Sequence, residues 1–167
     1  MIRSILIAAC CLIATNAGSF AQSKADAEKL ARALKGDTKG EAADNPQCKL
    51  FTKSEASTYI GGVVHNVENA AMGTGCQWTV GSNGGSMLVQ VVPARYHEKP
   101  SGASGYKKLP DVGAQAFVVP DMGGWHSGSL AGTHAVHVML SGKGATEAKT
   151  VDLLKEAIKR GAASPAK

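Results

Sequence analysis

The chain has 167 residues, of which 44% are hydrophobic and 19% charged, and its formal net charge at pH 7 is +5. This length is sufficient for one domain with a hydrophobic core. The positive charge is mild and no basic run is interleaved with aromatic residues, so we do not expect nucleic-acid binding.

Residues 1–21 have the layout of a secretory signal peptide. A short positive start precedes an apolar run, and the small residues Ser19 and Ala21 stand three and one before a cleavage site. The apolar run is shorter than the ~20 residues of a membrane-spanning helix. We therefore expect cleavage after Ala21, and a periplasmic or secreted protein without a stable membrane anchor. Lipidation at Cys10 is the main alternative, because the segment that ends there resembles a lipobox.

Cleavage would remove two of the four cysteines, Cys10 and Cys11, and leave Cys48 and Cys76. Two cysteines in an oxidising compartment are expected to form a structural disulfide. Their spacing is not that of a Cys-x-x-Cys redox pair, and two cysteines form no zinc site without histidines.

The region after the signal peptide divides into three parts. Residues 22–46 indicate a helix over Ser23–Leu34, followed by a flexible linker rich in glycine, aspartate and asparagine. A compact domain is predicted over residues 47–161, and residues 162–167 would form a frayed tail.

Two helices are predicted within the compact domain. Thr52 and Glu55 fit a capping box, and the helix they begin should run to about Ile60, where Gly61 allows a stop. The apolar stripe over Thr146–Lys159 predicts the last helix.

Between these helices, alternating or continuous apolar residues predict five to six strands. The expected strands cover residues 63–68, 76–80, 87–92, 114–119 and 134–140, with a short additional strand at 125–130. Residues 93–110 form a long connection without a clear period. Short strand spacing without intervening helices favours an α+β fold, with a single, mainly antiparallel sheet and helices packed on one face.

The pattern Cys48-Lys-Leu-Phe-Thr-Lys-Ser-Glu-Ala56, followed by Gly61-Gly62 and Cys76-Gln-Trp78, resembles a family of small bacterial secreted proteins and lipoproteins. That family carries a domain of unknown function. The segment Leu109-Pro-Asp-Val-Gly-Ala-Gln-Ala-Phe117 is similar to its Leu-Pro-Gly-Val-Gly-Asp-Ala-Ala-Tyr segment. The resemblance implies an α+β fold, a disulfide between the two cysteines and an extracytoplasmic location. It implies no catalytic residue and no ligand.

The five histidines are the main candidates for chemistry. His134 and His137 would point to opposite faces of one strand, because side chains alternate along a strand, so they cannot chelate one ion together. His65, His97 and His126 belong to other segments, with methionines between them. Histidine and methionine together suit copper, but no pair has chelating spacing. We therefore predict no metal and no cofactor.

No catalytic residue is predicted. The sequence has no Gly-x-Ser-x-Gly motif, the paired cysteines leave no free thiol, and no carboxylates stand at a spacing suited to glycoside hydrolysis. We therefore expect a non-enzymatic binding domain whose partner is an unidentified envelope protein or small ligand. The alternatives are an inhibitor or immunity-type protein acting on an envelope enzyme, and a metal or small-ligand carrier.

The expected contact surface consists of Tyr96, His97, Tyr106, Trp125 and His126. These residues lie in the long connection and near the glycine-rich turn at 122–124, and aromatic residues with a polar group are favoured at contact surfaces. Both segments join strands, so a folded sheet could bring them to one rim. The alternative for Trp125 is a place in the core.

Overall fold

The computed structural model describes residues 42–81 and 84–162. It contains one antiparallel sheet of seven strands in the order β1-β2-β3-β7-β6-β5-β4, together with two α-helices. The elements are η1 (Pro46–Lys49), α2 (Lys53–Ile60), β1 (Asn66–Ala70), η2 (Ala71–Gly73), β2 (Gly75–Thr79), β3 (Ser86–Pro93), η3 (Ala94–Tyr96), β4 (Lys107–Lys108), β5 (Ala114–Asp121), β6 (Gly124–Ala131), β7 (His134–Ser141) and α3 (Glu147–Lys159). The predicted signal peptide, the helix over residues 23–34 and residues 163–167 of the tail lie outside the described residues.

The predicted α+β class with a single antiparallel sheet is confirmed, but the strand number of five to six is wrong. The additional strand is β4, which lies inside the connection predicted over residues 93–110 and pairs with β5 through Lys107↔Val118 and Lys108↔Phe117. Two residues are too few to show an alternating pattern, so no periodicity along the chain indicates this strand.

Local signals define both helices. Thr52 Oγ1 accepts a hydrogen bond from the Glu55 backbone N–H, and the Glu55 carboxylate accepts one from the Thr52 N–H, which completes the predicted capping box. Gly61 ends α2 with a φ of 82°, a conformation that glycine adopts without steric cost. Thr146 caps α3 by accepting from the Lys149 N–H.

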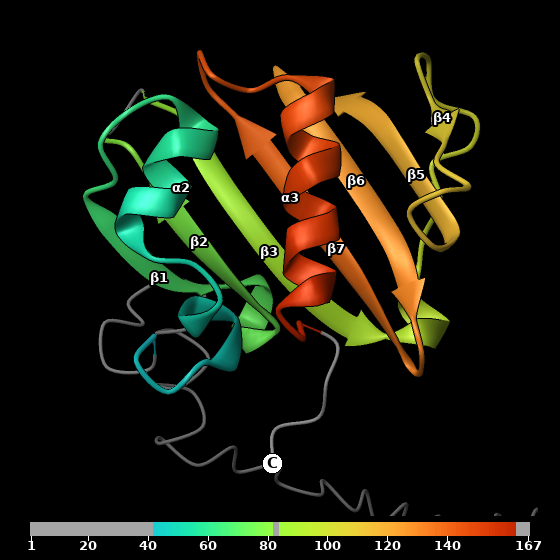
Figure 1. Cartoon of the computed structure of the whole chain (residues 1–167), viewed down its shortest axis with the longest axis horizontal. Coiled ribbons are helices and arrows are strands. Elements are labelled where there is room, and N and C mark those ends of the chain that lie inside the picture. Colours follow the sequence, from blue (N-terminus) through green and yellow to red (C-terminus); the bar gives the residue numbers. More distant parts are fainter. Residues whose placement is uncertain (1–41, 82–83, 163–167) are drawn as a thin grey trace, which may run out of the picture.

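The register of the sheet separates two faces. Figure 1 shows α2 and α3 in front of the sheet, with α2 beside β1–β3 and α3 in front of β6 and β7. The buried core lies between these helices and the sheet face they cover, here called the helix face. Its large members include Trp78, Phe51, Ile60, Met87, Val89, Val136, Val138, Leu140, Leu153 and Leu154.

The N-terminal edge of the described region is fixed by one covalent and several polar links. Cys48 and Cys76 form the predicted disulfide, which ties η1 to β2. Asn45 is 6% exposed, and its side-chain amide donates to the Gly75 carbonyl at 2.9 Å and to Asn69 Oδ1 at 2.6 Å. The compact structure therefore already includes Asn45, near the end of the region predicted as a linker.

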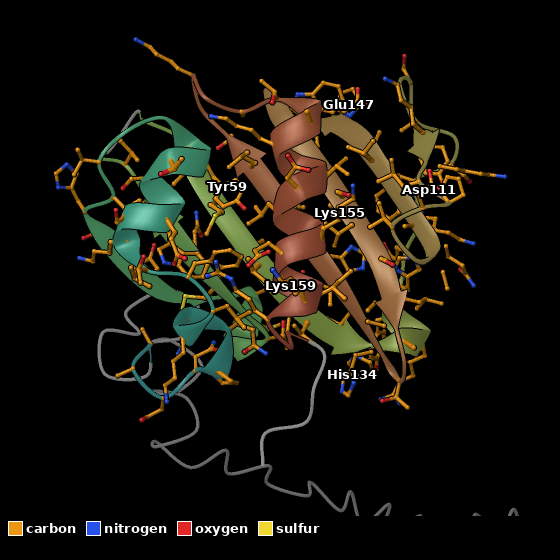
Figure 2. The ribbon with its side chains drawn as sticks, viewed as in Figure 1. Tyr59, Asp111, His134, Glu147, Lys155 and Lys159 are labelled. Atoms are coloured by element: carbon orange, nitrogen blue, oxygen red, sulfur yellow. A yellow bond between two sulfur atoms is a disulfide. The ribbon has the colours of Figure 1, made fainter. Side chains whose placement is uncertain are left out.

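Arg160 joins the end of α3 to the start of α2. Its guanidinium lies 4.5 Å from the centre of the Phe51 ring and donates to the Leu50 carbonyl, to Glu55 Oε1 and to Glu156 Oε1. The hydrogen bond from Arg160 lowers the pKa of Glu55 to about 2. This arrangement holds α2 and α3 against each other where they cover the helix face of the sheet. Figure 2 shows the outer side of both helices.

Candidate functional site

Strand alternation sends a second set of side chains to the face of the sheet turned away from the helices, here called the opposite face. In the β6–β7 pairing, His126 lies opposite Met139 and Gly128 lies opposite His137. In the β5–β6 pairing, Phe117 lies opposite the same Gly128. The register thus brings two histidines and a phenylalanine around one glycine.

Gly128 is the residue that makes room for these rings. A Cβ atom at this position would lie 2.8 Å from His137 Nδ1 and 2.9 Å from Phe117 Cε1, closer than ordinary contacts allow. The absence of a side chain at Gly128 therefore lets neighbouring rings lie across β6 in direct contact.

His97 reaches the same place from the connection between β3 and β4. Strand β5 has a register shift between Ala114 and Phe117, where Gln115 adopts a φ of 56°. At this bulge the Gln115 carbonyl oxygen lies 3.2 Å from His97 Nε2. Bulges often redirect groups next to functional sites, and this one supplies the hydrogen-bond acceptor that holds His97.

The three histidines form a hydrogen-bonded series, here called the histidine chain. His126 Nε2 lies 3.0 Å from His137 Nδ1, and His137 Nε2 lies 3.2 Å from His97 Nδ1. The ring centres of neighbouring histidines are 5.3 Å and 5.1 Å apart. His137 is the central member and uses both of its nitrogens.

One backbone carbonyl sets the direction of every bond in this chain. A carbonyl oxygen only accepts, so His97 Nε2 donates to Gln115, and the other nitrogen of a neutral imidazole is then an acceptor. His97 Nδ1 therefore accepts from His137 Nε2, and His137 Nδ1 accepts from His126 Nε2. The unprotonated nitrogen at the end is His126 Nδ1, which has no hydrogen-bond partner within residues 42–81 and 84–162.

Burial keeps two of these rings neutral at pH 7. Desolvation, aided by repulsion from His126 and His97, lowers the pKa of His137 to about 4. Desolvation also lowers the pKa of His126, although the nearby carboxylate of Asp121 acts in the opposite direction. The bond directions given above are those of these two neutral rings together with a neutral His97.

Phe117 is fully buried, and its ring packs against all three rings of the histidine chain. Its ring meets the His126 ring edge-on, with centres 5.1 Å apart, and stacks on the Tyr106 ring at 5.8 Å. His97 and His137 also contact it, at 5.9 Å and 6.1 Å between ring centres. Aromatic packing thus fixes the positions of polar rings whose hydrogen bonds run within the same cluster.

A cavity of about 270 Å³ opens at the histidine chain, and we call it the histidine pocket. Its walls come from strands β3, β6 and β7, and from the end of η3 with the residues that follow it. The lining residues are Gln90, Val92, Tyr96, Glu98, His126, His137 and Met139. Val92 and Met139 supply apolar surface to the cavity, and the other five lining residues carry polar groups.

The structure brings four of the five predicted contact residues together. His97, Tyr106 and His126 belong to the aromatic cluster around Phe117, and Tyr96 lines the histidine pocket with 56% of its surface exposed. Trp125 is half-buried and lies elsewhere. It precedes His126 on β6, so alternation sends its side chain to the helix face, opposite Pro120 and Leu140.

His137 lines the histidine pocket, although the sequence pattern did not place it among the expected contact residues. His134 and His137 do diverge, and Figure 2 shows His134 at the turn end of the β6–β7 hairpin. The partner of His137 is on the neighbouring strand instead. The signal for this partner is the two-residue turn of Gly132 and Thr133 between β6 and β7. Counting outward from this turn pairs Ala131 with His134 and His126 with Met139, which brings His126 close to His137.

Within the described ranges, no group of three or more His, Cys, Asp or Glu side chains is arranged to hold a metal ion. The three histidines form a chain and not a cage, because His137 faces its two neighbours with different nitrogens.

Among the helices in the described part of the chain, none is long and apolar enough to cross a membrane.

Comparison with known proteins adds no functional assignment. No protein family, curated protein or solved structure matches this chain.

Proposed function

We propose that this protein is a non-enzymatic binding domain of the periplasm or the extracellular space, and that its ligand binds in the histidine pocket. The observation that carries the proposal is the chain of neutral imidazoles at a partly apolar cavity of about 270 Å³. A ligand there would meet apolar side chains and the unprotonated His126 Nδ1, which can accept a hydrogen bond or coordinate an ion.

The geometry of the pocket favours binding over catalysis. The hydrogen bonds of His97, His126 and His137 run to one another and to the Gln115 carbonyl, and within the described residues none joins a serine, threonine or cysteine side chain or a carboxylate. Nucleophilic catalysis needs a histidine next to the hydroxyl or thiol that it activates. Here each inner nitrogen is already used to hold a neighbouring ring.

The location outside the cytoplasm has two supports. The N-terminal sequence has the pattern of a secretory signal peptide. The disulfide between Cys48 and Cys76 is of the kind that persists in an oxidising compartment.

The proposed function is tested by nuclear magnetic resonance of the exported protein with labelled histidine side chains. Low-molecular-weight fractions of bacterial envelope extract are treated with a chelator to remove metal ions and then added. We expect at least one fraction to shift the signals of His126 and His137 and to leave those of His65 and His134 unchanged. Shifts confined to His65 or His134, or no shift of His126 and His137 with any fraction or with an added metal ion, would contradict the proposal.

A matched pair of variants confirms the position of the ligand. Met139 lines the histidine pocket with 37% of its surface exposed, so Met139→Trp should fill the cavity and abolish the shifts. Lys155→Trp adds the same ring on the outer side of α3, where Figure 2 shows Lys155, and should have no effect on them.

A further inference from the structure

The geometry points to a copper site in the histidine pocket, with His126, His137 and Met139 as its ligands. This inference rests on the proposed function and names the chemical class of the ligand. All three residues belong to the β6–β7 hairpin and lie on the opposite face, since His126 pairs with Met139 and His137 stands two residues before Met139. All three also line the same cavity.

The two imidazole nitrogens that face each other lie close to the separation that a metal ion requires. His126 Nε2 and His137 Nδ1 lie 3.0 Å apart, and their ring planes are inclined by 34°. Metal–imidazole bonds of ~2.0–2.1 Å in tetrahedral geometry place two ligand nitrogens about 3.3 Å apart. An ion can therefore enter between these atoms after a small rotation of the half-buried His126 ring.

Copper would replace the proton that now joins the two rings. His126 Nε2 gives up its proton, and the other nitrogen of the same ring, Nδ1, takes one up from water. His137 Nδ1 is already unprotonated and needs no change. The number of protons on the protein stays the same, both ligands remain neutral, and no oxidant or reductant takes part in binding.

The rest of the histidine chain acts as the outer support of this site. His137 Nε2 donates to His97 Nδ1, and His97 Nε2 donates to the Gln115 carbonyl. Histidine ligands commonly donate their second N–H to a carbonyl or carboxylate, which fixes the tautomer and the orientation of the ring. The chain thus keeps His137 Nδ1 free of a proton and directed at His126.

The third ligand selects among metals. The Met139 thioether comes from the residue directly opposite His126 and is 37% exposed, in contrast to the fully buried Met87 of the core. Thioether sulfur is a soft donor that suits Cu(I), whereas carboxylate and carbonyl oxygens suit magnesium and calcium. Two imidazoles and one thioether are three donors, and none of them is an oxygen. This set favours copper, and only two of its three donors are His, Cys, Asp or Glu side chains.

The test measures Cu(I) affinity of the exported protein by competition with bicinchoninate, with ascorbate as the reductant because it leaves the disulfide intact. We expect one Cu(I) per chain. His126→Asn should weaken binding by about 100-fold, and Met139→Leu should weaken Cu(I) binding by about tenfold while leaving Zn(II) binding unchanged. The matched controls His134→Asn and Met122→Leu alter residues away from the pocket and should bind as the wild type.

X-ray absorption spectroscopy of the copper-loaded wild-type protein provides a second measurement. It needs no variant, so a variant that fails to fold does not affect it. We expect two imidazole nitrogens and one sulfur around the ion. A spectrum without sulfur, the absence of saturable Cu(I) binding, or a loss of binding in His134→Asn as large as in His126→Asn would overturn the inference.

This failure can be told apart from failure of the proposed function. If copper does not bind but a chelator-treated envelope fraction still shifts the signals of His126 and His137, the copper site is wrong and the binding function stands. If neither copper nor any fraction acts on these residues, both proposals are wrong.

Discussion

Acidification should destabilise this protein well above the pH at which carboxylates protonate. The structural reason is His137, which is 7% exposed and has its pKa lowered from 6.5 to about 4. When the chain unfolds, this imidazole regains its ordinary pKa. Below pH 6.5 the unfolded state therefore binds a proton that the folded state does not, so the free energy of unfolding falls as the pH falls.

The magnitude follows from the size of the shift. One pKa unit corresponds to about 1.4 kcal/mol, so His137 contributes a loss of roughly 3 kcal/mol between pH 6.5 and pH 4, and about 2 kcal/mol of it by pH 5. The lowered pKa of His126 adds to the loss in the same direction. Glu55 contributes only below its ordinary value of 4.5. Measurements between pH 7.5 and 5 therefore isolate the histidines.

The assay is urea unfolding of the metal-free protein at pH 7.5, 6.5, 5.5 and 5. His137→Gln should reduce stability at pH 7.5 and flatten the dependence on pH, because the titrating group is gone. His65→Gln, at an exposed position before β1, should leave the slope unchanged. Equal stability at pH 7.5 and 5, or the same slope in His137→Gln as in the wild type, would refute the reasoning.

Three further substitutions test the packing described above, each by urea unfolding. Gly128→Ala places a Cβ within 3.0 Å of two rings and should cost ~1–3 kcal/mol, whereas Gly102→Ala meets no atom within 4 Å and should cost less; equal costs would contradict the role of Gly128. Arg160→Lys loses the planar, multiply bonded guanidinium and should cost about 1–2 kcal/mol. Cys48→Ser should cost roughly 2–5 kcal/mol, and an unchanged midpoint would show that the disulfide adds no stability.

The elements that could be predicted from the sequence are those fixed by neighbouring residues. The capping box at Thr52, the stop at Gly61 and the apolar stripe of α3 each act within a few residues, and all three appear in the structure. The first strand was displaced, from residues 63–68 to Asn66–Ala70. Val64 is buried in the core, and the residues between α2 and Asn66 form the connection from the helix to β1.

The elements that escaped prediction depend on partners distant in the sequence. Strand β4 exists because two residues of a long connection meet the outer edge of β5. The bulge at Gln115 is a shift between two strands, and one strand alone carries no trace of it. Helix rules and strand alternation describe a segment by itself, so they cannot detect either feature.

The histidine site falls between these two cases. The sequence contained enough to place His126 near His137, because a two-residue turn fixes the register of the β6–β7 hairpin. A comparison of histidines along one strand separates His134 from His137, and it does not reveal that the neighbouring strand β6 supplies His126 as the partner of His137. His97 was beyond reach, because it lies forty residues from His137 along the chain and enters through the bulge.

The bulge is therefore more than a local irregularity of β5. It turns one carbonyl, that of Gln115, toward His97, and this single acceptor fixes which nitrogen of His97, His137 and His126 carries a proton. A sheet without the bulge would leave both tautomers of each ring accessible. His126 Nδ1, the ring nitrogen left free for a ligand, would then carry a proton in some molecules and not in others. The chemistry of the pocket thus depends on backbone geometry in a strand that does not line it.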